Sequence, residues 1–175
     1  MQDYEFRARI FFKNMISMMQ TQGMDSYYLV LAVGAKLLAQ LNAEYGIGTQ
    51  KPTLPNNVAM FDWVSQLDIV KIADAVFMHG GLATIKESIW EQVPIVIVPL
   101  GKDQMDNALR IKRTGVGLAA DVADLSPSDL RNLFTQATAS TWVRQNLASM
   151  KAIFQTAETA KPSVNIIKSV IPSSP

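Results

Sequence analysis

Residues 77–107 of the chain read FMHGGLATIKESIWEQVPIVIVPLGKDQMDN. An apolar run leads into this stretch and ends at the only histidine, His79, after which Gly80 and Gly81 follow. Residues 82–91 have helical character, and a second apolar run after them ends in a proline. Parallel strands are joined by crossover helices of this kind, and the N-terminus of such a helix binds anions. The stretch therefore predicts a strand, a glycine turn, a helix and a second strand, with a candidate anion site at the turn.

Length and composition predict a globular protein with a substantial core. The chain has 175 residues, of which 49% are hydrophobic, and its formal net charge is +1. This balance offers no basic surface for nucleic acid. The absence of cysteine excludes disulfides, thiolate metal sites and cysteine nucleophiles, and it leaves the compartment open. No uninterrupted apolar run approaches the roughly 18 residues of a membrane span, so no membrane segment is expected.

Helical and strand patterns alternate along most of the chain. The run YYLVLAV at residues 27–33 is continuously apolar, which is typical of a strand buried on both faces of a parallel sheet. Ser126, followed by a proline and by Asp129, predicts a helix start. The expected elements are helix 4–22, strand 27–33, helix 35–45, strand 57–61, helix 65–73, strand 75–78, helix 82–91, strand 94–98, helix 103–113, strand 116–119 and helices 126–137, 142–154 and 162–170.

Such alternation predicts an α/β fold with a doubly wound, Rossmann-like parallel sheet. We expect residues 1–175 to form one domain, because no repeat and no linker is visible. Nucleotide-binding halves of this architecture usually open on a strand followed by a glycine or serine turn, whereas this chain opens on a helix. The pattern indicates either that the first strand is missing or that the protein dispenses with it.

Several polar or glycine-containing turns are expected at one rim of this sheet, because ligands bind outside the carboxyl ends of parallel strands. These turns contain Gly34, Asp62-Trp63, His79-Gly80-Gly81 and residues 100–104. Their convergence favours a ligand site more strongly than any single motif does.

The turn His79-Gly80-Gly81 is a candidate phosphate or diphosphate site. Glycines allow the backbone to approach a ligand, the helix start presents free N–H groups, and Thr84 adds a hydroxyl donor. Glu87 lies eight residues after His79 on the same helix face, where its carboxylate is suited to a ribose diol. An ordinary strand-to-helix turn and a solvated glutamate are the alternatives.

Two further positions flank this turn. Trp63 follows the strand at residues 57–61 and is suited to stacking on a nucleobase, the alternative being that it packs on a helix. Asp103 and Gln104 follow the strand that ends in a proline, where an acceptor and an amide are suited to sugar hydroxyls. Helix capping by the aspartate is the alternative there.

Taken together, these residues resemble the donor-binding signature of the UDP-glycosyltransferases, family-one enzymes of the two-domain GT-B type. The family pattern places a tryptophan before a short helix, then a His-Gly-Gly or His-Cys-Gly turn, a hydroxyl residue, a glutamate, a Gly-x-Pro strand start and an Asp/Glu-Gln pair. The matching residues are Trp63, His79-Gly80-Gly81, Thr84, Glu87, Val93-Pro94, Asp103-Gln104 and the following Asn107-Ala108. Ser65 and Val93 depart from the usual proline and glycine, and Ala83 stands where a polar residue is common, so one phosphate contact is expected to be missing.

The resemblance implies that the chain binds a nucleotide sugar. Trp63 would stack on uracil beside the backbone of Val64, the glycine turn and Thr84 would hold the diphosphate, and the other polar residues would hold the two sugars. In sequence order, the implied binding residues are Trp63, Val64, His79, Gly80, Gly81, Thr84, Glu87, Asp103 and Gln104.

The family places the acceptor site and the catalytic base, a histidine assisted by an aspartate, in an N-terminal domain that this sequence does not contain. The resemblance therefore implies the C-terminal donor half of an inverting glycosyltransferase, with no catalytic residue of its own, no metal, and no cofactor besides the UDP-sugar donor. Such a half would be inactive alone. Two alternatives stay open: a donor subunit of the N-acetylglucosaminyltransferase type that acts on a lipid-linked acceptor, and a non-catalytic nucleotide-sugar-binding module.

Overall fold

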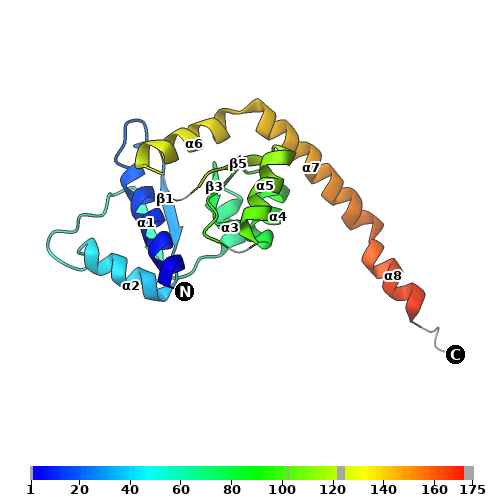
Figure 1. Ribbon diagram of the computed structural model, residues 1–175, viewed down its shortest axis with the longest axis horizontal. Coiled ribbons are helices and arrows are strands. Elements are labelled where there is room, and N and C mark those ends of the chain that lie inside the picture. The colour runs from blue at the N-terminus through cyan, green and yellow to red at the C-terminus, as the bar shows by residue number, and fades with distance from the viewer. Residues whose placement is uncertain (1, 102, 122–124, 172–175) are drawn as a thin grey trace.

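The computed structural model of the chain describes residues 2–101, 103–121 and 125–171. Helices and strands alternate over most of this length, and helices alone follow the last strand (Figure 1). The predicted order of elements is confirmed. The elements are α1 Gln2–Met18, β1 Leu29–Ala32, α2 Ala35–Glu44, β2 Val58–Phe61, α3 Gln66–Val70, β3 Val76–Met78, α4 Leu82–Glu91, β4 Ile95–Ile97, α5 Gln104–Thr114, β5 Gly117–Ala119, α6 Pro127–Ala139, α7 Thr141–Ala160 and α8 Pro162–Val170.

The strands pair in parallel, as the alternation with helices predicted. β1 pairs with β2, and β4 lies between β3 and β5. The strands therefore form two separate parallel sheets, β2-β1 and β3-β4-β5. β1 is an edge strand of the first sheet, and β3 is an edge strand of the second. A cavity of about 810 Å³ is lined by both of these edge strands, so it lies between the two sheets.

The two sheets differ in burial. Every residue of β4 is buried, because this strand has a neighbour on each side. In β1 only Leu31 is buried, and Ala32 is exposed. The prediction that the run at residues 27–33 is buried on both faces is therefore wrong, since one edge of β1 borders the cavity and the two tyrosines before it are exposed.

Two hydrophobic clusters hold the fold together. The first joins α1 to the strands and to α6, and its members include Met15, Val96 and Leu130. The second joins α4, α5 and α7 to the other face of β4, and it includes Ile97 and Leu147. Helices thus cover both faces of the β3-β4-β5 sheet, as expected for a doubly wound fold.

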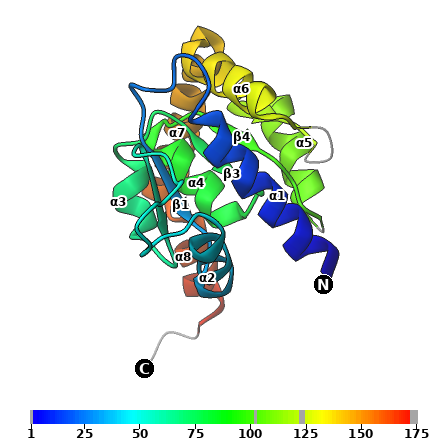
Figure 2. The ribbon, with the colours of Figure 1, turned by 90° about the vertical axis from the view of Figure 1, so that its left-hand side faces the viewer.

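Helix α1 runs antiparallel to β1, and it lies in front of the strands in Figure 2. Near its start, Lys36 Nζ at the beginning of α2 lies 2.8 Å from the Glu5 carboxylate. Beyond its other end, Asn57 Nδ2, just before β2, donates to the Met24 carbonyl at 3.2 Å. These contacts place the start of α1 at the edge where the strands end.

The helix start predicted at Ser126 is confirmed as a capping box. The Ser126 hydroxyl accepts from the Asp129 N–H at 3.2 Å, and the Asp129 carboxylate accepts from the Ser126 N–H at 3.0 Å. Hydrogen bonds from the Ser126 side chain and backbone lower the pKa of the Asp129 carboxyl. The cap fixes where α6 begins, and therefore where α6 meets α1.

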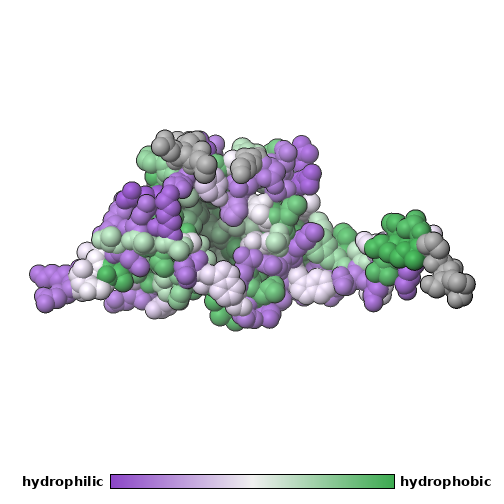
Figure 3. All heavy atoms as spheres, turned by 90° about the horizontal axis from the view of Figure 1, so that it is seen from below, coloured by the Kyte–Doolittle hydropathy of each residue, from purple (hydrophilic) through white to green (hydrophobic). Residues whose placement is uncertain are grey.

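Helix α7 begins against α4, and its later part and α8 extend away from the rest of the molecule (Figure 1). No residue of α8 is buried, and Ile166 and Val170 are 66% and 73% exposed. Apolar atoms accordingly dominate this end of the molecule in Figure 3. Within the described parts of the chain, none of the helices combines the length and the apolar character needed to cross a membrane.

Candidate functional site

The turn between β3 and α4 has a backbone that requires glycine. Gly80 has a φ of 106°, and a Cβ on it would lie 3.3 Å from the carbonyl oxygen of Gln104. The buried Asn107 donates from Nδ2 to the Gly80 carbonyl at 2.9 Å. The first turn of α5 therefore packs directly against this turn and holds its carbonyl. The glycine turn predicted from the sequence is confirmed, and Asn107 is the side chain that fixes it.

The N-terminus of α4 opens at the end of this turn. Gly81 is the N-cap and offers the helix no side-chain hydrogen bond. The N–H groups of Leu82, Ala83 and Thr84 lie in the first turn, where a helix has no backbone acceptor for them. The His79 Nε2 lies 3.6 Å from where a Cβ on Gly81 would be, so the imidazole borders the same space. N–H donors and the positive end of the helix dipole make this space suited to an anion.

Gln66, the first residue of α3, joins α3 to α4 beside this helix start. Its Nε2 donates to Thr84 Oγ1 at 3.1 Å and to a carboxylate oxygen of Glu87. Thr84 and Glu87 are neighbours on one face of α4, and both are half-buried. Gln66 therefore holds the carboxylate next to the open helix start. It was not among the residues predicted from the sequence, although its place three residues after Trp63 was an available signal.

Trp63 stands at the carboxyl end of β2. Its side chain is 74% exposed, so the alternative that it packs on a helix surface does not hold. Its backbone N–H donates to the neighbouring Asp62 carboxylate at 2.8 Å, which fixes the chain at this point. Val64 is half-buried and lines the cavity between β1 and β3. An exposed indole at this edge is available for stacking on a planar ligand.

Ser65 occupies the N-cap of α3, but its hydroxyl does not bond to the helix backbone. It donates instead to the Asp68 carboxylate at 2.5 Å. The hydrogen bond from Ser65, followed by that from Lys71, lowers the pKa of the Asp68 carboxyl. The Ser65–Asp68 bond spans the first turn of the short helix that carries Gln66.

Asp103 and Gln104 behave differently from one another. Asp103 is the N-cap of α5, is exposed, and makes no capping hydrogen bond with its side chain, so simple helix capping does not account for it. Gln104 is buried, and its Oε1 accepts from the N–H groups of Leu100 at 2.8 Å and Gly101 at 3.1 Å. Gln104 therefore organises the loop after β4 through its side-chain oxygen.

These contacts place the predicted residues in one row along the carboxyl ends of the strands. Gln66 links the start of α3 to α4, and Gly80 links the α4 turn to Gln104 at the start of α5. Figure 3 looks onto this edge of the molecule. The cavity behind it is lined by Val64, His79 and Thr84 among others. Among the described residues, no group of three histidine or acidic side chains is placed to hold a metal ion.

The fold is that of glycosyltransferases of the GT-B type. The glycotransferase of kitacinnamycin superposes with a TM-score of 0.79 at 23% identity, over 93% of this chain and 39% of that chain. CalG4, the calicheamicin glycosyltransferase, superposes with a TM-score of 0.75 at 22% identity, over 94% and 41%. The glycosyltransferase VinC in complex with DTDP gives 0.67 at 23% identity, over 89% and 37%.

The sequence identifies the family within this class. The family described as UDP-glucoronosyl and UDP-glucosyl transferase matches residues 16–162, and the chain belongs to it. The human UDP-glucuronosyltransferases 1A9 and 1A1 are each 31% identical over 108 residues. That match covers 61% of this chain and 20% of each relative, so the chain spans a fifth of their length.

Proposed function

We propose that this chain is the donor-binding half of an inverting glycosyltransferase that moves a sugar from a UDP-sugar to an acceptor hydroxyl. The observation that carries this proposal is the open N-terminus of α4 beside a fixed carboxylate. N–H groups, Thr84 and His79 surround a space suited to a diphosphate, and Gln66 holds Glu87 next to it. A nucleoside diphosphate needs an anion site and a nearby hydrogen-bond acceptor together, because its diphosphate is attached directly to the ribose that carries the hydroxyls.

The row of residues suggests how the donor lies. Trp63 takes the uracil by stacking, with the backbone of Val64 at its edge. Glu87 accepts hydrogen bonds from the ribose, and the turn at His79 takes the diphosphate. Asp103 accepts from the hydroxyls of the donor sugar, and the NH₂ of Gln104 donates to them, since its oxygen is occupied by the loop. The names of the human relatives and the DTDP complex of VinC support a nucleoside-diphosphate donor.

The residues of this chain contribute to catalysis through the leaving group. In the complete enzyme, a base in an N-terminal acceptor domain would remove the proton of the acceptor hydroxyl. The oxygen would attack the anomeric carbon from the face opposite the diphosphate, and the bond to UDP would break. His79 and the N-terminus of α4 would stabilise the negative charge that builds on the departing diphosphate. No cofactor besides the donor takes part.

We expect the folded chain to bind UDP at one saturable site. Most of the affinity should come from the diphosphate contacts, so uridine should bind far more weakly than UDP. Isothermal titration calorimetry with UDP, UMP and uridine measures this order. Competition with UDP-glucose, UDP-glucuronic acid and UDP-N-acetylglucosamine then separates the main proposal from the N-acetylglucosaminyltransferase alternative. A folded sample that binds none of these compounds would refute the donor site.

We also expect no sugar transfer by this chain alone, because the proposed base lies in another domain. Incubation with UDP-glucose or UDP-glucuronic acid and a panel of phenols should release no UDP above the rate without protein. Glycoside formation by the purified chain would contradict this expectation. Donor binding combined with inactivity of the longer parent protein would favour the non-catalytic module instead.

A further inference from the structure

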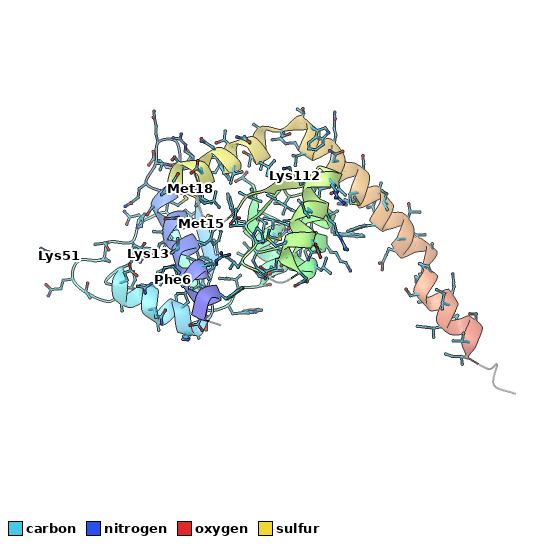
Figure 4. The ribbon with its side chains drawn as sticks, in the orientation of Figure 1. Phe6, Lys13, Met15, Met18, Lys51 and Lys112 are labelled. Carbon is cyan, nitrogen blue, oxygen red and sulfur yellow. The ribbon has the colours of Figure 1, made fainter. Side chains whose placement is uncertain are left out.

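A second hollow lies at the edge where the strands begin, opposite the glycine turn. It is lined by the loop between α1 and β1, by Asp74 before β3, by α6 and by the start of α7. Figure 1 shows this loop and α6 together at one edge, and Figure 4 shows Met18, the last residue of α1, beside α6. The volume of the hollow is about 710 Å³, which suits a small-molecule site.

Two arginines from different helices line this hollow. Arg131 of α6 is half-buried, and its Nη1 donates to the Gln22 carbonyl at 3.4 Å. The Nη2 of Arg144, in α7, donates to the Thr138 carbonyl in the last turn of α6. A guanidinium has several N–H donors, so most donors of both arginines are left over by these bonds. Among the described residues, no carboxylate forms an ion pair with either arginine.

The hollow carries more positive than negative charge. Asp74 is exposed, and it is the only acidic side chain among the described residues that line the hollow. Thr135 and Thr138 line it as well, but their hydroxyls donate to carbonyls of α6, at 3.0 Å to Arg131 and 2.8 Å to Phe134. The two guanidinium groups are therefore the charged donors that the hollow offers to a ligand.

Apolar side chains lie between the two arginines. The Tyr27 ring packs edge-on against Phe134, with the ring centroids 4.7 Å apart, and the buried Met24 lines the same hollow. Along α6, Phe134 lies between Arg131 and Thr138, whose carbonyl holds the other guanidinium. These two positions are about 10 Å apart along a helix. The hollow thus has a cation toward each end and an apolar wall between them.

We propose that this hollow binds a small, elongated organic anion with a phosphate or carboxylate group at each end of an apolar body. One end would accept paired N–H bonds from Arg131 and the other from Arg144, since the planar guanidinium matches the oxygens of both kinds of anion. The body would lie against Tyr27 and Phe134. The bonds to the two carbonyls hold the guanidinium groups in place beforehand, which lowers the cost of ordering them. The site lies at the edge opposite the donor site, so the inference does not depend on nucleotide binding.

An NMR titration with a synthetic probe tests this site. The probe is 1,6-hexanediol bisphosphate, which has a phosphate at each end of an alkyl chain. Hexyl phosphate, with the same chain and one phosphate, and inorganic phosphate are the comparison compounds. The backbone amide signals of Tyr27 and Thr135 report on the hollow, and those of Gly80 and Thr84 report on the donor edge.

The bisphosphate should shift the signals of the hollow and bind at least about tenfold more tightly than hexyl phosphate, because only the bisphosphate reaches both arginines. Arg131→Gln should lower the affinity for the bisphosphate to about that for hexyl phosphate. Arg113→Gln is the matched control, since it removes the same charge from the last turn of α5, outside the hollow. It should leave the affinity unchanged.

Arg144 also holds the end of α6, so two substitutions are compared at this position. Arg144→Gln removes the cation, and Arg144→Lys keeps the charge but loses the paired donors. Both should lower the affinity for the bisphosphate, with circular dichroism showing that each variant is folded. Equal affinities for the bisphosphate and hexyl phosphate would overturn the proposal. An unchanged affinity in Arg131→Gln, an equal loss in Arg113→Gln, or shifts confined to Gly80 and Thr84 would overturn it as well.

Discussion

Replacing Gly117 by alanine is expected to lower the free energy of unfolding by about 3 kcal/mol. Gly117 opens β5 and pairs with Ile95 of β4 in the centre of the three-stranded sheet. A Cβ on Gly117 would collide with the Ile95 carbonyl oxygen, and it would lie 2.9 Å from the Ile95 Cβ and 3.0 Å from its carbonyl carbon. The obstacle is mainly backbone inside a buried sheet, so β5 would have to move away from β4.

Urea denaturation followed by circular dichroism measures this loss. Gly48→Ala is the matched control, because Gly48 has a φ of 87° but nothing within 4 Å of the place where the new methyl group would lie. Its cost should be limited to the backbone conformation, about 1 kcal/mol. A Gly117→Ala variant no less stable than Gly48→Ala would mean that β4 and β5 are not packed as described.

Replacing Glu87 by alanine is expected to weaken UDP binding by about 10- to 100-fold while stability changes little. The proposed role of the carboxylate is to accept hydrogen bonds from the ribose, and a charged acceptor contributes more than a neutral one. Within the protein, Glu87 accepts from Gln66 at a half-buried position, so its loss leaves no deeply buried group without a partner. Calorimetric titration with UDP and thermal unfolding of the same sample measure the two effects.

Glu91→Ala is the control for this substitution, because Glu91 is the other acidic residue of α4 and is its last residue, four positions farther from the helix start than Glu87. It removes the same charge from the same helix away from the proposed site. If Glu87→Ala destabilised the fold strongly, its bond to Gln66 would be mainly a structural link between α3 and α4. If both variants bound UDP as well as the parent chain, Glu87 would have no part in the donor site.

Much of the architecture could be read from local patterns. The turn at His79 was predictable because glycine is required wherever a chain adopts a φ such as the 106° of Gly80. The start of α6 was predictable because the Ser126–Asp129 cap involves residues only three positions apart. The family was also accessible from the sequence, since the spacing of polar residues at the strand ends is a linear pattern, and the match over residues 16–162 confirms the family.

Other features depended on contacts between distant segments. Gln66 bonds to side chains 18 and 21 positions away, so its link to Thr84 and Glu87 has no local pattern. The sequence predicted only a ligand-binding role for Gln104. Its side-chain oxygen also organises the loop after β4, and this role becomes visible only once the position of that loop is known. The hydrogen-bond partners of a side chain are set by what packs beside it, and sequence spacing alone does not specify this.

The motif at residues 77–107 thus had its strand, turn and helix specified by short-range chemistry: apolar runs, glycines and the hydrophobic period. The burial of strand β1, in contrast, was decided by the tertiary structure. Its apolar run predicts burial whatever surrounds it, but burial is achieved only when strands and helices lie on every side. Because none of the strands in the described part of the chain lies between β1 and β3, β1 remains half-exposed beside a cavity of about 810 Å³.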